Sequence, residues 1–294
     1  MSIYDLHGIE LYHDYTVTGD AVDRTYDING NLVFPVTIPD MTVMSFNVGM
    51  FYSEWHAAPS SVSDAFYLRN KRIFDKYQLD FAGMSEWCRT IGTVNASVLM
   101  EEEFAAYYPN YTPYPNDPDA ALTSGFSLVP DSVTLVRYQT QGGQTRYYQK
   151  SYIDYYGKRI CCIVTHLDLQ DSARTAQFSE LMQAVQNEDY FIITGDFNFE
   201  ILSIGDTEYN KSIKVALDLG YNSAQNNSGI LMTWYSGETV ATSQKITCLD
   251  NIITSSNISI LSVERDETKL TDGMCEEYGI IIDHLPLVAT LRIN

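Results

Sequence analysis

Residues 189–199 read DYFIITGDFNF, a run of β-forming apolar side chains followed at once by Asp196 and Asn198. A short continuous apolar run of this kind is typical of a buried strand. Polar groups at the end of a buried strand are costly unless they are satisfied, and binding sites gather at strand ends. The segment therefore predicts a buried strand that delivers two polar side chains to a site.

The same arrangement recurs along the chain. Asn47 ends TVMSFN, Glu86 ends DFAGMSE, His166 ends CCIVTH, Asp250 follows ITCL, and Asp283 and His284 follow GIII. Taken singly, each is an ordinary turn or strand-end residue. Six strand ends that bear Asn, Glu, His, Asp-x-Asn, Asp and Asp-His indicate one shared site.

The composition describes an acidic globular protein. The chain has 294 residues, of which 45% are hydrophobic and 19% are charged, so wholesale disorder and fibrous classes are excluded. Its 38 acidic and 18 basic side chains give a formal net charge of −20, and a protein that binds nucleic acid through its overall charge would be positive. We therefore expect a phosphate-bearing substrate to bind at a local site, together with a metal cation.

The cysteines and the N-terminus bear on location. The five cysteines form no CxxC motif, and Cys161 and Cys162 lie in an apolar run that predicts buried small hydrophobic side chains. The N-terminus lacks the pattern of a signal peptide, and no apolar stretch approaches the ~18 residues of a membrane span. We expect a soluble protein, intracellular by default, with its location otherwise open.

The order of elements predicts an α+β fold. Helical spacing is expected at residues 65–77, 98–108, 173–186 and 211–219, between strands that in places follow one another directly. Residues 1–40, with seven acids and the single base Arg24, read as a β-rich arm or linker of short strands ahead of a domain at 41–294.

The strand-end motifs resemble those of the endonuclease/exonuclease/phosphatase superfamily, the DNase I-like proteins. The matching segments are SFNV (45–48), DFAGMSEW (80–87), THLDL (165–169), GDFNF (195–199), CLDNIITS (248–255) and IDHLPLVATL (282–291). The resemblance covers about residues 41–294 and implies a four-layered α/β sandwich, with two mostly antiparallel sheets packed face to face and flanked by helices.

Phosphodiester hydrolysis needs neutralised phosphoryl charge, an activated in-line water and a stabilised leaving oxygen. Glu86 is the best ligand for Mg2+, with Mn2+ or Ca2+ as alternatives, helped by Asn47 and Asp283. The resemblance implies that Asp196 orients and deprotonates the water or holds a second metal. It also implies the remaining roles: Asn198 bonds the phosphate or nucleophile, His284 contacts the phosphate and is polarised by Asp250, and His166 acts as general acid or second phosphate contact.

The substrate class is less determined by the sequence. Ser85 stands where the superfamily commonly has Gln, and His166 stands where its DNA-repair branch tends to carry Tyr. Residues 133–160 carry five bases against one acid with tyrosines interleaved, which suits a polynucleotide strand or simply a tyrosine-rich strand face. Arg146, Lys150 and Tyr148 are the substrate-binding candidates.

The sequence thus predicts a Mg2+-dependent phosphodiesterase, most readily a nuclease acting on DNA rather than RNA. A sphingomyelinase-like enzyme, a small-molecule phosphodiesterase or phosphatase, and a non-catalytic accessory module tethered through residues 1–40 are the alternatives. A monomer is expected, while endo or exo action and the number of metals stay open.

Overall fold

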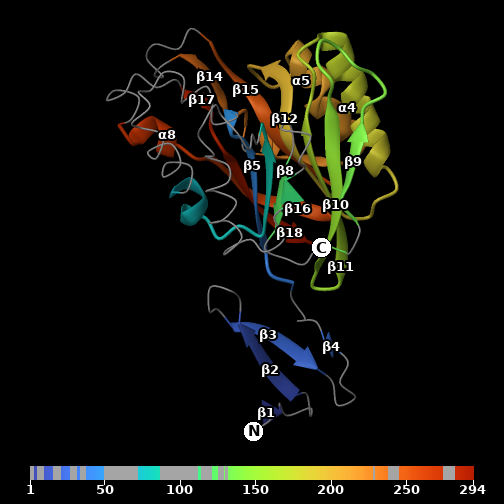
Figure 1. Cartoon of the computed structure of the whole chain (residues 1–294), viewed down its shortest axis with the longest axis vertical. Coiled ribbons are helices and arrows are strands. Elements are labelled where there is room, and N and C mark those ends of the chain that lie inside the picture. Colours follow the sequence, from blue (N-terminus) through green and yellow to red (C-terminus); the bar gives the residue numbers. More distant parts are fainter. Residues whose placement is uncertain are drawn as a thin grey trace.

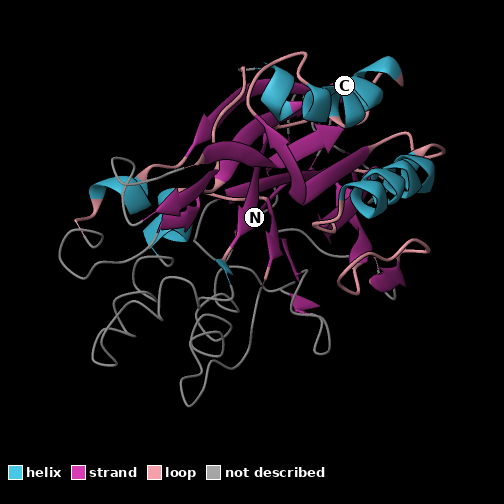
Figure 2. Cartoon of the chain, turned by 90° about the horizontal axis from the view of Figure 1, so that it is seen from above, coloured by secondary structure: helices cyan, strands magenta, loops and turns pink. Residues whose placement is uncertain are grey.

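The computed structural model describes residues 38–49, 72–86, 129, 132–227, 229–237, 245–273 and 282–294, and the backbone of six short strands outside these ranges. Two large β-sheets lie face to face, and helices flank them (Figures 1 and 2). The α+β sandwich predicted from the sequence is confirmed. No helix in the described ranges combines the length and the apolarity that a membrane crossing requires.

The larger sheet has the strand order β17-β14-β15-β12-β11-β10-β9, with β13 paired to β15. Its strands are β9 (Thr134–Arg137), β10 (Tyr147–Tyr155), β11 (Lys158–His166), β12 (Phe191–Ile201), β13 (Asn222–Ser223), β14 (Trp234–Gly237), β15 (Ile246–Thr254) and β17 (Ile282–His284). Among the described strands of this sheet, only β11 and β12 pair in parallel, and the long helix α4 (Asp171–Val185) connects them. A parallel connection requires such a crossover.

The second sheet has the order β16-β18-β5-β6-β8-β7. Its strands are β5 (Met41–Asn47), β6 (Phe81–Ser85), β7 (Thr112–Pro113), β8 (Ala121–Ser124), β16 (Ile258–Arg265) and β18 (Leu287–Ile293). The strands β1 (Ile3–Tyr4), β2 (Glu10–Tyr15), β3 (Ala21–Tyr26) and β4 (Leu32–Val33) form a third, antiparallel sheet that pairs with neither of the others (Figure 1). The short strands expected in residues 1–40 are therefore present.

Alternating side chains build three apolar layers. Val43 of β5 and Val164 of β11 lie in the core between the sheets. Met44 and Phe46 lie on the outer face of the second sheet, against Phe74 of the helical residues 72–76. The outer face of the larger sheet packs on α4, α5 (Thr207–Lys211) and α6 (Ile213–Asp218). Two short helices, α7 (Ala224–Asn227) and α8 (Thr268–Thr271), complete the described part.

Three predicted helices lie where expected, with changed ends. The helix expected at 173–186 is α4, and part of the helix expected at 65–77 is seen at residues 72–76. The helix expected at 211–219 is present as α6, although it begins only at Ile213. A separate short helix, α5, precedes it; Asp206 caps α5 by accepting a hydrogen bond from Tyr209 N, and the non-helical backbone of Ser212 separates the two helices. The helix expected at 98–108 lies outside the described residues.

The two sheets are in close contact where β5 and β6 face β12. The Ser45 hydroxyl accepts a hydrogen bond from Gly195 N at 2.9 Å across the interface. A Cβ atom on Gly83 would lie 1.8 Å from Thr194 Oγ1, so only glycine fits there without movement. This contact fixes the position of β5 and β6 relative to β12, and with it the distance between the strand ends that carry the polar residues.

We expect Gly83→Ala to destabilise the protein by about 1–3 kcal/mol, because the added methyl group overpacks the interface between the sheets. Thr194→Ala removes the atom in closest conflict, so the double variant should be clearly more stable than the sum of the two single changes predicts. Urea denaturation of all four proteins measures this. Gly205→Ala is the control, since nothing lies within 4 Å of its Cβ and its effect should simply add to that of Thr194→Ala. Additive losses for Gly83→Ala and Thr194→Ala would contradict the model of close approach.

Candidate active site

Alternation along four strands brings polar side chains to one end of the space between the sheets. Each follows a series of apolar side chains that point into the space between the sheets. Asn47 follows Met41 and Val43 in this way, His166 follows Cys162 and Val164, and Asp196 follows Ile192. Strand β15 runs in the opposite direction, so Asp250 comes before the apolar Ile252. The register pairs His166 with Asp196 and Asp196 with Asp250. Three predicted site residues are thus neighbours across adjacent strands.

Asp196 lies at the centre of this group. Its Oδ2 atom accepts a hydrogen bond from Asn47 Nδ2 at 2.9 Å and lies 3.5 Å from Nε2 of both His166 and His284. Its Oδ1 atom accepts from Asn198 N at 2.9 Å. Burial, together with the charge of Asp250, outweighs the effect of His284 and raises the pKa of Asp196 to about 6.

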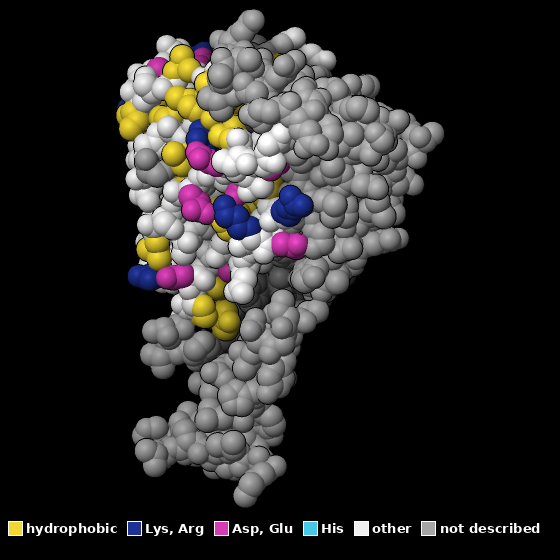
Figure 3. Space-filling model, turned by 90° about the vertical axis from the view of Figure 1, so that its left-hand side faces the viewer, with side chains coloured by type: hydrophobic (Ala, Val, Ile, Leu, Met, Phe, Trp, Pro, Cys, Tyr) yellow, Lys and Arg dark blue, Asp and Glu magenta, His cyan; other side chains and the backbone are white. Residues whose placement is uncertain are grey.

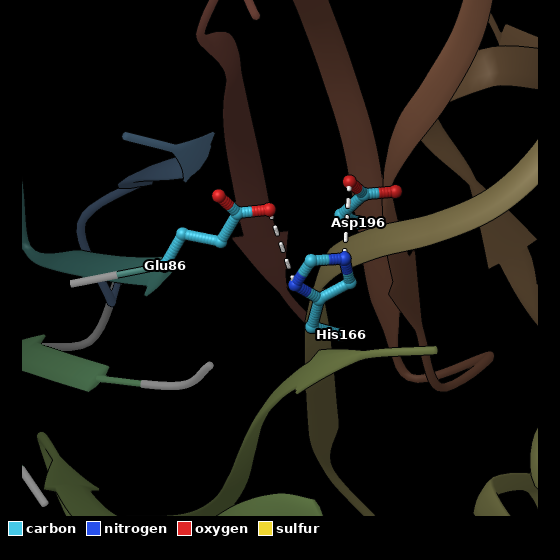
Figure 4. A group of neighbouring side chains, drawn as sticks. All are labelled: Glu86, His166 and Asp196. Carbon is cyan, nitrogen blue, oxygen red and sulfur yellow. Dashed lines mark ion pairs between the residues drawn. The ribbon is translucent and has the colours of Figure 1, made fainter. Parts of the chain in front are cut away.

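Glu86 faces the same centre from the end of β6. Its Oε1 atom accepts from Asn47 Nδ2 at 3.0 Å and lies 3.6 Å from His166 Nδ1, and Figure 4 shows His166 between Glu86 and Asp196. Burial is the main cause that raises the pKa of Glu86 to about 7. Its φ of 55° lies in the left-handed region, which is uncommon for Glu and is found where a site fixes a side chain.

His284 and Asp250 form the expected pair. His284 Nδ1 lies 2.9 Å from Asp250 Oδ2, and the Asp250 side chain is fully buried. Burial alone would lower the pKa of His284, but the carboxylates of Asp250, Asp283 and Asp196 raise it to about 10. His284 is therefore an imidazolium ion near neutral pH and presents positive charge to the site.

His166 differs from His284 in charge. Its Nε2 atom lies 3.2 Å from Arg146 Nη2, and because a guanidinium can only donate, this nitrogen accepts. Burial, the Arg146 charge and the His284 charge hold the pKa of His166 well below its usual value. A neutral imidazole that already accepts at Nε2 does not suit a general acid, so the geometry favours the second expected role, a hydrogen-bonding contact.

Asn198 is buried at the site, but not in the way that strand spacing suggests. Its φ is 54°, and the register of β12 against β15 shifts between Asp196 and Ile201. Its side-chain amide donates to the Leu167 carbonyl at 2.8 Å. In this structure Asn198 therefore braces the segment that follows His166.

The donor set fits a hard divalent cation. Glu86 and Asp283 offer partly exposed carboxylates, and the charge of Asp283 adds to the effect of burial in raising the pKa of Glu86. Asn47 Oδ1 accepts from Gly49 N at 2.8 Å and keeps a second lone pair. Among the residues that the structure describes, two groups have ligand atoms close enough to share an ion: Glu86, His166 and Asp196, and Asp196, Asp250 and His284, of which the second could bind one only with His284 deprotonated.

Of the three substrate-binding candidates, the structure brings only Arg146 to the site. Lys150 Nζ bonds Glu188 Oε1 at 2.8 Å beyond the C-terminal end of α4, and Tyr148 packs in the layer beneath that helix. The predicted basic and aromatic patch is thus divided between the site and a strand face. Figure 3 shows the side of the molecule with β14, β17 and α8 in Figure 1, and there basic and acidic side chains are interspersed.

One contact at the site was not predicted from the sequence. Trp234 Nε1 donates to Asp283 Oδ1 at 2.9 Å, from strand β14, which lies beside β17. The two residues are 49 positions apart, and nothing in the sequence around Trp234 marks it as a neighbour of a carboxylate. Trp234 therefore fixes the orientation of one of the two carboxylates among the three metal-ligand candidates.

No protein-family model matches the sequence, and no curated protein matches it significantly. Solved structures do match. TDP2 from D. rerio, crystallised with a single-stranded DNA product, superposes with a TM-score of 0.64 at 15% identity, covering 86% of this chain and 99% of that one. The chain has the DNase I-like fold.

Two bacterial proteins of the same fold agree. An endonuclease/exonuclease/phosphatase from Bacteroides vulgatus has a TM-score of 0.61 at 14% identity and covers 87% of this chain and 100% of its own. A family protein from Leptotrichia buccalis C-1013-b has a TM-score of 0.59 at 16% identity and covers 86% and 100%. The endonuclease/exonuclease/phosphatase resemblance of the motifs is confirmed at the level of the fold.

We expect Asp250→Asn to move the pKa of His284 from about 10 toward its ordinary value, because the variant loses the charge that holds the proton. The folded-state pKa lies above the unfolded value of about 6.5, so the pair stabilises the fold fully below pH 6.5 and loses this contribution as the pH rises through 10. NMR titration of the imidazole C–H resonances from pH 5 to 11 measures the pKa. Asp266→Asn, a buried carboxylate bound instead to Lys76 and Tyr77, is the control. A wild-type midpoint near 6.5 would refute the assignment.

Proposed function

We propose that this protein is a divalent-metal-dependent phosphodiesterase whose substrate is nucleic acid, with DNA favoured over RNA. The observation that carries the proposal is the cluster of the partly exposed Glu86 with the buried Asp196, Asp250 and His284, in which an imidazolium lies among carboxylates where strand ends of the two sheets meet. The neighbour crystallised with a single-stranded DNA product supports the substrate class. All of these residues belong to residues 41–294, to which we assign the activity.

The charges of the site residues suggest a separate role for each of them. Glu86 and Asp283, oriented by Asn47 and Trp234, would hold the cation. When bound, Mg2+ or a similar ion neutralises charge on the phosphoryl oxygens. His284 places a second positive charge opposite the carboxylates, with its Nε2 atom turned toward Asp196. Both charges suit a phosphate that gains negative charge on its leaving oxygen.

Asp196 is the proposed base. Its pKa of about 6 lies closer to neutrality than that of an ordinary Asp, so it can take a proton from water and still be ionised at pH 7. Asn47 and Asn198 N fix its two oxygens, which keeps the carboxylate in one orientation. His166 lies beside Asp196, with Arg146 against it, and the two would offer hydrogen bonds to a phosphate oxygen.

His284→Ala should slow cleavage by about 10²–10⁴-fold, because it removes the positive charge next to the reacting phosphate. The assay is conversion of supercoiled plasmid and shortening of labelled single-stranded DNA with Mg2+, beside an EDTA-treated sample. His13→Ala, in strand β2, is the matched control and should cleave as the wild type does. Equal cleavage by His284→Ala, or cleavage that survives EDTA, would refute the proposal. Cleavage of RNA, sphingomyelin or small phosphodiesters alone would correct the substrate class.

Mg2+ should raise the thermal midpoint of the wild type, and Glu86→Gln should lose most of this rise. An ion at 100 times its Kd stabilises a protein by about 2.7 kcal/mol. Because the pKa of Glu86 is about 7, the carboxyl is protonated at lower pH, and the effect of Mg2+ should grow between pH 6 and 8. Differential scanning fluorimetry measures it, with Glu188→Gln as control, since Glu188 bonds Lys150 and Tyr152 away from the site. An unchanged Mg2+ response in Glu86→Gln would place the ion elsewhere.

A further inference from the structure

Arg146 is held in an unusual place for a cation. Only 2% of its surface is exposed, and its guanidinium lies 3.2 Å from His166 Nε2. It ends a loop, residues 139–146 (QTQGGQTR), that has no helical or strand structure of its own. A long flexible side chain placed by an irregular loop needs other contacts to keep a single position.

Gln141 supplies the first of these contacts from within the loop. Its Oε1 atom accepts from Arg146 N at 2.7 Å, and its Nε2 atom donates to the Tyr138 and Arg146 carbonyls. The amide therefore closes the loop by hydrogen bonds to both of its ends. It fixes the backbone of Arg146 relative to the end of β9.

Asp168 ties this loop to the segment that carries His166. Its carboxylate accepts from the backbone N–H groups of Gly142, Gly143 and Gln144 at 3.2, 3.4 and 3.2 Å, and from Gln170 N at 2.8 Å. Its own N–H donates to Gln177 of α4. Burial raises the pKa of Asp168, but these N–H groups and Arg146 outweigh burial and hold it below its ordinary value.

Gly142 shows how close the two segments are. A Cβ atom at this position would lie 2.4 Å from Asp168 Oδ1 and 2.6 Å from its Cγ. A side chain on residue 142 would therefore push the loop away from the carboxylate. The contact depends on both partners, an acid two residues after His166 and a glycine four residues before Arg146.

We infer that Asp168 is a positioning residue, which holds the 139–146 loop so that Arg146 lies against His166 and faces the substrate site already charged and oriented. Its effect on turnover rests on the proposed function, because it acts through Arg146 on a bound phosphate. The placement of Arg146 itself rests on geometry alone. The two parts can therefore be tested separately.

A double-mutant cycle tests the first part. Asp168→Asn puts an amide donor where the loop presents only N–H groups, and we expect kcat/KM on DNA to fall about tenfold. Arg146→Ala should cost about 100-fold, and adding Asp168→Asn to it should change kcat/KM less than twofold, because the side chain to be positioned is gone. A tenfold loss that persists in the Arg146→Ala background would overturn the inference.

Asp206→Asn is the matched control. Asp206 also accepts three backbone N–H groups, from Leu202, Ser203 and Tyr209, but it caps α5 and does not contact the Arg146 loop. It should lower the thermal midpoint much as Asp168→Asn does and leave kcat/KM unchanged. Equal kinetic losses in both variants would show that general stability, not positioning, is responsible. If Asp168→Asn fails to fold, Gly142→Ala disturbs the same contact from the other side.

A measurement without turnover separates this inference from the proposed function. The 15N resonance of His166 Nε2 reports whether a donor faces it, so it should shift in Arg146→Ala and in Asp168→Asn but not in Asp206→Asn. If the wild type cleaves no phosphodiester, the proposed function fails and this spectrum still decides the placement of Arg146. An unchanged resonance in Asp168→Asn would refute it.

Discussion

The close approach of the two sheets is the constraint on which the site depends. Gly83 leaves room for Thr194, and the Ser45 hydroxyl bonds Gly195 across the interface. Two residues beyond Ser45 along β5, Asn47 reaches both Glu86 of its own sheet and Asp196 of the other. A wider spacing would break that bridge, because a single amide nitrogen makes both contacts. The two hydrogen bonds of Asn47 are thus a consequence of the missing side chain at Gly83.

The site, like the chain as a whole, has an excess of acidic side chains. The net charge of −20 gives no general attraction for a phosphate. The pKa of Glu86 rises to about 7 and that of Asp196 to about 6, since buried carboxylates are hard to ionise together. Positive charge enters through His284, through Arg146 and, in our proposal, through a cation. In our proposal, the phosphate of the substrate binds where these groups converge.

Much of this arrangement could be predicted from the sequence, because strand alternation is local. A polar residue behind an apolar run marks a strand end, and Asn47, His166 and Asp196 were found that way. The partner strands and their spacing were not, so Trp234 beside Asp283 was missed. The left-handed backbone at Asn198 was also missed, since it follows from a bulge in the pairing of β12 with β15 rather than from residue type.

Arg146 and Lys150 show where local charge counting fails. Both belong to one basic stretch, and simple alternation would put them on the same face with Tyr148. Lys150 follows that rule and faces α4, where Glu188 neutralises it. Arg146 precedes the first residue of β10, so the pleat does not orient it, and the contacts of Asp168 and Gln141 do so instead. Two features therefore decide which basic side chain of such a stretch reaches the site: the residue at which the strand begins, and the contacts that hold the loop before it.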